Sequence, residues 1–210
     1  MELRNIAGRE VAVRKGDGRC LITFFADFDR DALQEMFDSV PDATIAAVGL
    51  TDWNAEMSPW DAPPVFGEEG FGHGAQDTLD YITGSLIPEM GCDRYMIGGY
   101  SLAGLFSLWA CYRTDAFECC AAASPSVWFP GWDPFIRDNR MNAGHVYLSL
   151  GDREAKTRNQ VMRTVADRIQ LQYDVLKGSG TDTILEWNHG NHFQDVVTRK
   201  ARAFGWILSR

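Results

Sequence analysis

One short stretch constrains the fold of this 210-residue chain more than any other. Residues 98–104 read GGYSLAG, between an apolar run at 95–97 and a second one at 105–110. The first run predicts a buried strand, and the second predicts a helix that is buried on most sides. Gly99 and Ala103 permit a tight turn, because a larger side chain at either place would collide with the neighbouring backbone. The stretch therefore predicts a strand, a sharp turn that carries Ser101, and a helix.

The same alternation of strand and helix continues along most of the chain. Apolar runs predict strands at residues 9–14, 20–25, 44–50, 95–99, 118–123, 146–150 and 183–187, of which the first two read as an early strand pair. Helical spacing of apolar residues predicts helices at 75–89, 102–112, 157–177 and 195–208. Another helix is expected to be capped by Asp29 or Asp31 and to end at Phe37. This order predicts an α/β fold with a mostly parallel, twisted sheet and helices on both faces.

Two segments, 51–74 and 124–144, are expected to be long loops, the first rich in proline and glycine and the second rich in aromatic residues. Long loops in compact domains often carry function.

Size and charge narrow the class of protein. The length suits one domain that spans residues 1–210, and 45% hydrophobic with 23% charged residues is the composition of a soluble globular protein. The net charge is −9 and the basic residues are scattered, so nucleic acid is not expected as a partner. No apolar stretch is long enough for a secretory signal or a membrane span, which predicts a cytoplasmic protein without membrane contact.

The five cysteines are an odd number without the spacing of a metal site. Several lie in apolar runs, so buried free thiols are expected. No motif for a metal or for another cofactor is present, and none is predicted.

The pattern G-x-S-x-[GA] around Ser101 is that of a nucleophile elbow. A serine nucleophile requires a base, and a histidine base is usually oriented by an acid, with the order serine, acid, histidine in folds of this kind. Only His189 and His192 lie in the loop between the last strand and the last helix. We favour His192 as the base, because Gly190 allows a turned backbone before it and Phe193 can anchor the loop. His189 is then expected to line the site.

The acid is expected after the strand at 146–150. Glu154 matches a G-x-x-[DE] spacing from Gly151, and Asp152 is the alternative. The oxyanion of the reaction needs two backbone donors. One is expected to be the N–H of Leu102, and the other comes from the loop after residue 25, with Ala26 or Asp27 favoured over Phe28.

Several aromatic residues follow strands and are candidates for the walls of a substrate site. The candidate substrate-binding residues, besides His189, are Trp53, Asn54, Trp60 and Trp128.

With these residues in place, the chain resembles the esterase family of α/β-hydrolases that includes enterochelin-type siderophore esterases and esterase D-like enzymes. The similarity runs from about residue 46 to 208. Its marks are residues 86–88 (LIP), 98–106 (GGYSLAGLF), 123–128 (ASPSVW), 150–151 (LG) followed by Glu154, and 190–193 (GNHF). The resemblance implies an α/β-hydrolase fold, compact and without a large lid, with Ser101 as nucleophile, His192 as base and Glu154 as favoured acid. Some siderophore-esterase relatives work with a serine–histidine pair and little help from an acid, so the acid's role stays open.

These observations predict a serine carboxylester hydrolase that cleaves a small or medium ester through an acyl-enzyme. The same residues would also serve an acyltransferase, and a binding protein that keeps the fold without chemistry is a further alternative. Neither the substrate nor the oligomeric state follows from the sequence.

Overall fold

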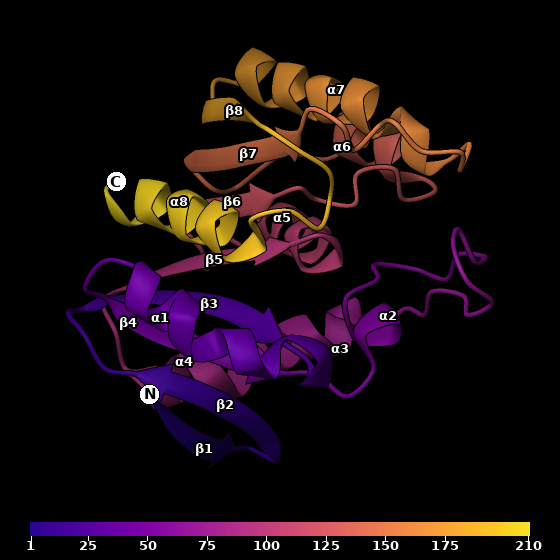
Figure 1. Ribbon diagram of the computed structural model, residues 1–210. Coiled ribbons are helices and arrows are strands. Elements are labelled where there is room, and N and C mark those ends of the chain that lie inside the picture. The colour runs from indigo at the N-terminus through magenta and orange to yellow at the C-terminus, as the bar shows by residue number, and fades with distance from the viewer.

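An eight-stranded sheet forms the centre of the computed structural model, which describes residues 1–210 (Figure 1). The strands lie in the order β1-β2-β4-β3-β5-β6-β7-β8. They span Glu2–Ile6 (β1), Arg9–Arg14 (β2), Arg19–Phe25 (β3), Thr44–Gly49 (β4), Arg94–Tyr100 (β5), Cys119–Ala123 (β6), His145–Gly151 (β7) and Asp182–Asn188 (β8). The strands from β3 to β8 are parallel, whereas β1 and β2 are antiparallel to their neighbours.

Helices cover both faces of the sheet. They span Asp27–Ala32 (η1), Leu33–Ser39 (α1), Trp53–Glu56 (α2), Ala75–Tyr81 (α3), Ile82–Leu86 (η2), Ile87–Met90 (α4), Leu102–Arg113 (α5), Trp132–Asp138 (α6), Met162–Thr164 (η3), Val165–Gly178 (α7) and Val196–Leu208 (α8). On one face, Phe37 of α1 and Phe204 of α8 pack in one cluster with Met96 of β5. On the other face, Phe106 of α5 packs in a second cluster with Ile97. Successive strand residues point to opposite faces, so both must be apolar, and the predicted parallel sheet between helices is confirmed.

The predicted pairing of the first two strands is wrong. The strand at 9–14 (β2) pairs with β1 and β4, and the strand at 20–25 (β3) lies between β4 and β5. Strand β1 was not predicted from the sequence; it forms a hairpin with β2 through Ala7 and Gly8, both with positive φ. A two-residue turn with positive φ at both positions matches the twist of antiparallel strands. Gly8 was the sequence signal for this turn.

The helix that contains Phe37 is not capped by Asp29 or Asp31, as was expected, and it ends at Ser39. It is preceded by a 3-10 helix, η1, whose Asp29 carboxylate accepts the N–H of Ala26 at 2.8 Å, and α1 itself begins at Leu33. Asp29 therefore closes the loop after β3 instead of capping α1.

The two segments expected to be loops each contain a short helix, α2 in the first and α6 in the second. Pro134 lies in the first turn of α6, where a missing N–H costs nothing, and the indole of Trp132 is buried and donates to Gln172 at 3.0 Å. The seven residues of α6 are too few to show a helical spacing of apolar residues, so this helix was not predicted. The helix expected from 157 begins at Val165, and Val161 is exposed.

All five thiols are free. Four of them are buried, as predicted, and Cys92 is half-buried. None of the helices combines the length and the apolar character that crossing a membrane requires.

Candidate active site

Ser101 lies at the turn between β5 and α5, with a φ of 59° and a ψ of −123°. A serine is rarely stable in this conformation, so the surroundings must hold it there. Its N–H donates to Ala123 at 3.2 Å, and its carbonyl accepts the N–H of Ser126 at 3.1 Å. A Cβ atom at Gly99 would lie 2.6 Å from the Ala103 backbone, so only glycine fits there. The predicted strand, turn and buried helix are therefore present.

His192 approaches the serine from the loop between β8 and α8. Its Nε2 lies 3.0 Å from the Ser101 hydroxyl oxygen, and its side chain is 23% exposed. The hydroxyl of Tyr100 donates to the His192 carbonyl at 2.8 Å and holds the loop. Phe193 does not anchor the loop as expected, because it is 86% exposed. Its ring contacts the His192 ring edge to face instead.

Glu154 lies behind the imidazole. Its Oε2 is 2.7 Å from Nδ1 of His192, and its side chain is only 4% exposed. The second oxygen, Oε1, accepts the N–H of Gly151 and the hydroxyl of Ser124, each at 2.7 Å. With a proton on Nδ1 directed at Glu154, Nε2 is free to take the proton of Ser101.

The protonation of Glu154 results from two opposing effects. Burial acts to raise its pKa, and the hydrogen bonds from His192, Ser124 and Gly151 lower it. The hydrogen bonds and the electrostatic attraction of His192 together outweigh burial, so the pKa lies below the ordinary value of 4.5. The carboxylate is therefore ionised at neutral pH and able to stabilise an imidazolium.

Arg199 of α8 completes the surroundings of the acid. It is 2% exposed and donates to Oε1 of Glu154 at 3.2 Å, to the Tyr100 hydroxyl at 3.1 Å and to the His189 carbonyl at 2.9 Å. Arg199 thus links the acid to the strand and the loop that carry the serine and the histidine. Arg199 was not predicted as a site residue from the sequence, although a cation beside the apolar stripe of α8 was a usable signal.

Asp152 and His189 lie outside this arrangement. Asp152 accepts the N–H of Gly190 at 2.8 Å, and this hydrogen bond lowers its pKa. The His189 side chain is 73% exposed and faces Asp152 at 3.4 Å. Asp152 therefore ties the end of β7 to the histidine loop, whereas Glu154 is the carboxylate that contacts His192.

The backbone donors expected for an oxyanion are only partly free. The N–H of Leu102, the first in α5, makes no hydrogen bond. The N–H of Ala26 already donates to Asp29, while those of Asp27 and Phe28 make none. Of the candidates in this loop, Asp27 and Phe28 have the donors that are open.

Comparison with known proteins identifies the architecture. An IroE-like serine hydrolase from Shewanella oneidensis aligns with a TM-score of 0.76 and 15% identity, over 96% of this chain and 76% of that chain. The siderophore hydrolase EstA from Aspergillus nidulans aligns with a TM-score of 0.70 and 16% identity, over 96% and 90% of the two chains. The corresponding values for a Bacillus cereus carboxylesterase are 0.65, 14%, 97% and 95%. This chain has the α/β-hydrolase fold. No family model and no curated protein matches its sequence.

In this α/β-hydrolase fold, a cavity of about 440 Å³ opens at Ser101 and His192. Its walls are mostly apolar and include Phe24, Phe28, Trp53, Val196 and Val197. Trp53 is the candidate substrate-binding residue that lines it.

The other candidate wall residues lie elsewhere. Trp60 donates from its indole to the Pro130 carbonyl at 2.8 Å and packs against Phe129. Trp128 is buried against Phe71. These two tryptophans pack the long loops together, and neither they nor Asn54 line the cavity. Position after a strand was not enough to decide which ring faces the substrate site.

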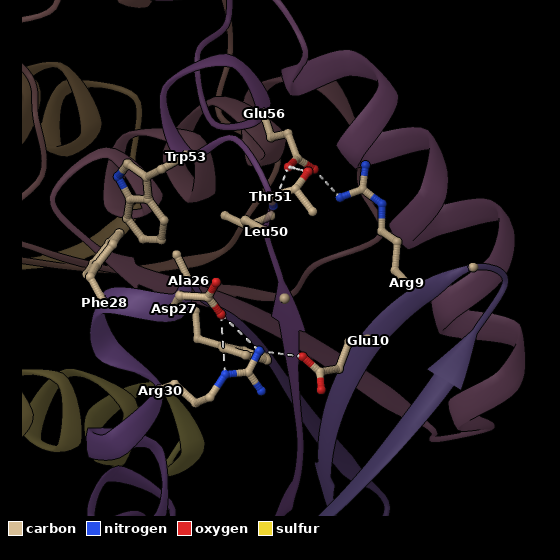
Figure 2. A pocket seen from close by; sticks show the side chains of 13 residues that line it. Arg9, Glu10, Ala26, Asp27, Phe28, Arg30, Leu50, Thr51, Trp53 and Glu56 are labelled. Atoms are coloured by element: carbon tan, nitrogen blue, oxygen red, sulfur yellow. Dashed lines mark hydrogen bonds and ion pairs between the residues drawn. The ribbon is translucent and has the colours of Figure 1, made fainter.

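A larger cavity of about 840 Å³ adjoins the first at the ends of β3 and β4 (Figure 2). The two cavities share Phe28 and Trp53, whose rings meet edge to face at 5.1 Å. Figure 2 shows an ion pair between Arg9 and Glu56 across the cavity from Trp53 and Phe28, and ion pairs from Arg30 to the carboxylates of Glu10 and Asp27 below them. Phe28 and Trp53 therefore lie where this larger cavity meets the cavity at Ser101.

Proposed function

We propose that this protein is a serine carboxylester hydrolase that works through an acyl-enzyme. The observation that carries the proposal is the continuous contact from the Ser101 hydroxyl to Nε2 of His192 at 3.0 Å and from Nδ1 to Glu154 at 2.7 Å. Both distances are those of hydrogen bonds between a nucleophile, its base and the group that orients the base. The esterases and serine hydrolases among the similar structures support the same reaction class.

In the first step, the Ser101 oxygen attacks the carbonyl carbon of the ester while its proton passes to Nε2 of His192. Glu154 stabilises the resulting imidazolium. Negative charge develops on the former carbonyl oxygen, and the Leu102 N–H at the start of α5, with Asp27 or Phe28, would donate to it. The imidazolium then gives its proton to the departing alcohol, and the acyl group stays on Ser101.

In the second step, water takes the place of the alcohol. His192 removes a proton from the water as its oxygen attacks the acyl carbon, and the proton then returns to the Ser101 oxygen as the bond to the acyl group breaks. The products are a carboxylic acid and the free enzyme. The apolar cavity of about 440 Å³ favours a small or medium acyl group.

Labelling with a fluorophosphonate probe tests the proposal. We expect the wild-type protein to carry the label on the peptide that contains Ser101, and S101A and H192A to remain unlabelled. S126A is the control that tells the two neighbouring serines apart, because the Ser126 hydroxyl lies only 3.4 Å from that of Ser101. This variant should still carry the label. Label on S101A, or its absence from folded wild-type protein that also leaves p-nitrophenyl esters intact, would disprove the assignment.

A further inference from the structure

Lys200 is a buried cation that the proposed reaction does not use. It follows Arg199 on α8, and its side chain is 9% exposed. It lines the apolar cavity that also contains Ser101 and His192. Val196 and Val197 of the same helix line that cavity too, so this side of α8 faces the space where an acyl group would lie.

The ammonium of Lys200 makes no hydrogen bond within the chain. The nearest carboxylate oxygen, Oδ2 of Asp29, lies 3.9 Å away, which is beyond hydrogen-bond distance. The other oxygen of Asp29 is occupied by the Ala26 N–H at 2.8 Å. Burial lowers the pKa of Lys200, and the charge of Asp29 opposes that effect. A lysine has three N–H donors, so those of Lys200 are free for a molecule bound in the cavity.

The charges around Lys200 restrict what it can bind. Asp29 and Asp31 also line the cavity, so an anionic group of a ligand placed there would be repelled by two carboxylates. A neutral oxygen acceptor would take a hydrogen bond from the ammonium without this repulsion. The rest of the wall is mostly apolar, so the acceptor must be carried by an otherwise apolar group.

We propose that Lys200 is a specificity-determining residue that donates a hydrogen bond to a neutral oxygen on the acyl chain of the ester. The substrate class is then an ester whose apolar acyl group carries an internal carbonyl or a similar neutral acceptor. This inference rests on the proposed esterase function. It adds a polar contact to a cavity whose other contacts are mostly apolar.

The test compares p-nitrophenyl esters of straight-chain acids with keto analogues of the same length. The keto group is moved one carbon at a time along the chain, and an ester with a terminal carboxylate completes the series. A hydrogen bond from a charged donor predicts that one keto ester exceeds its alkyl counterpart about tenfold or more in kcat/KM. The ester with the terminal carboxylate is expected to have the lowest kcat/KM of the series. In K200M the keto preference should disappear while the alkyl esters are still hydrolysed.

The outcomes separate the two proposals. Hydrolysis of the alkyl esters by the wild-type protein without any keto preference would overturn the role of Lys200 and leave the esterase function intact. A preference for the carboxylate ester, or a keto preference that persists in K200M, would overturn it as well. Absence of all hydrolysis and of fluorophosphonate labelling would instead overturn both. If K200M does not fold, K200L takes its place, and absence of a keto preference in the wild type still overturns the role of Lys200.

Discussion

Two consecutive cations on one turn of α8 have very different surroundings. Arg199 donates to oxygens of Glu154, Tyr100 and His189, all within 3.2 Å. Lys200 has only Asp29, at 3.9 Å. Both side chains are at least nine-tenths buried, so burial alone does not distinguish them. The difference indicates that Arg199 belongs to the internal framework of the site, whereas Lys200 has donors left for a bound molecule.

The largest effect is expected at the carboxylate that Arg199 supports. E154Q keeps the shape of the side chain but loses the charge that would stabilise the His192 imidazolium, so kcat should fall about 10³- to 10⁴-fold. Steady-state hydrolysis of a p-nitrophenyl ester measures it. D152N is the matched control and should change kcat far less, because Asp152 contacts Gly190 and His189 instead. A loss below tenfold in E154Q would mean that the serine and histidine act without an acid.

Removal of Arg199 should cost stability as well as activity. R199M leaves Glu154 buried without its cationic partner, so the free energy of unfolding should fall by about 3–5 kcal/mol. Urea denaturation measures the loss. R199K retains the charge and should recover part of both stability and kcat/KM.

A positioning role for Arg199 predicts more than a stability loss. Loss of a buried cation 3.2 Å from Glu154 favours the protonated state of the serine, histidine and glutamate taken together, so the acid limb of the kcat/KM profile should move to higher pH in R199M. An unchanged acid limb in folded R199M would reduce Arg199 to a structural residue.

The contribution of Glu154 to stability should depend on pH. The pKa of Glu154 is lowered from 4.5 by folding, so its contribution to stability is present above that value and is lost as the pH falls through the folded pKa. The stability difference between the wild type and E154Q should therefore shrink in acid. Thermal unfolding from neutral pH downward measures it, and a constant difference would contradict the charged state of Glu154.

The smallest effect on stability is expected at Lys200. K200M removes a costly buried ammonium and only one distant ion pair, so the free energy of unfolding should change by less than about 1 kcal/mol at neutral pH. The same urea experiment measures it beside R199M. A loss as large as that of R199M would show that the Asp29 pair is structural and that the comparison between the two cations fails.

Local backbone requirements made part of the site predictable. Only glycine fits at position 99, and a strand followed by a buried helix on either side of Ser101 has a clear apolar pattern. The spacing from Gly151 to Glu154 also has a local cause, because the Gly151 N–H donates to Oε1 and a Cβ there would lie 2.9 Å from that oxygen. Such constraints act over a few residues and can be read along the chain.

Contacts between distant segments were not predictable in this way. β2 was paired with the wrong neighbour, because strand order depends on which apolar faces meet after the chain has crossed the sheet. Trp60 and Trp128 were grouped with Trp53, because position after a strand does not tell whether an indole points into a cavity or packs beneath a loop.

The sequence by itself determined the parallel sheet, the turn at Ser101 and the order of serine, carboxylate and histidine, since these depend on periodicity and on short-range backbone geometry. The tertiary structure alone decided that Arg199 meets Glu154 and that Lys200 faces the cavity. Both residues lie on the same turn of α8, and their roles follow from the way that helix packs on the sheet beside α1. That packing depends on segments far apart in the chain, which no local pattern encodes.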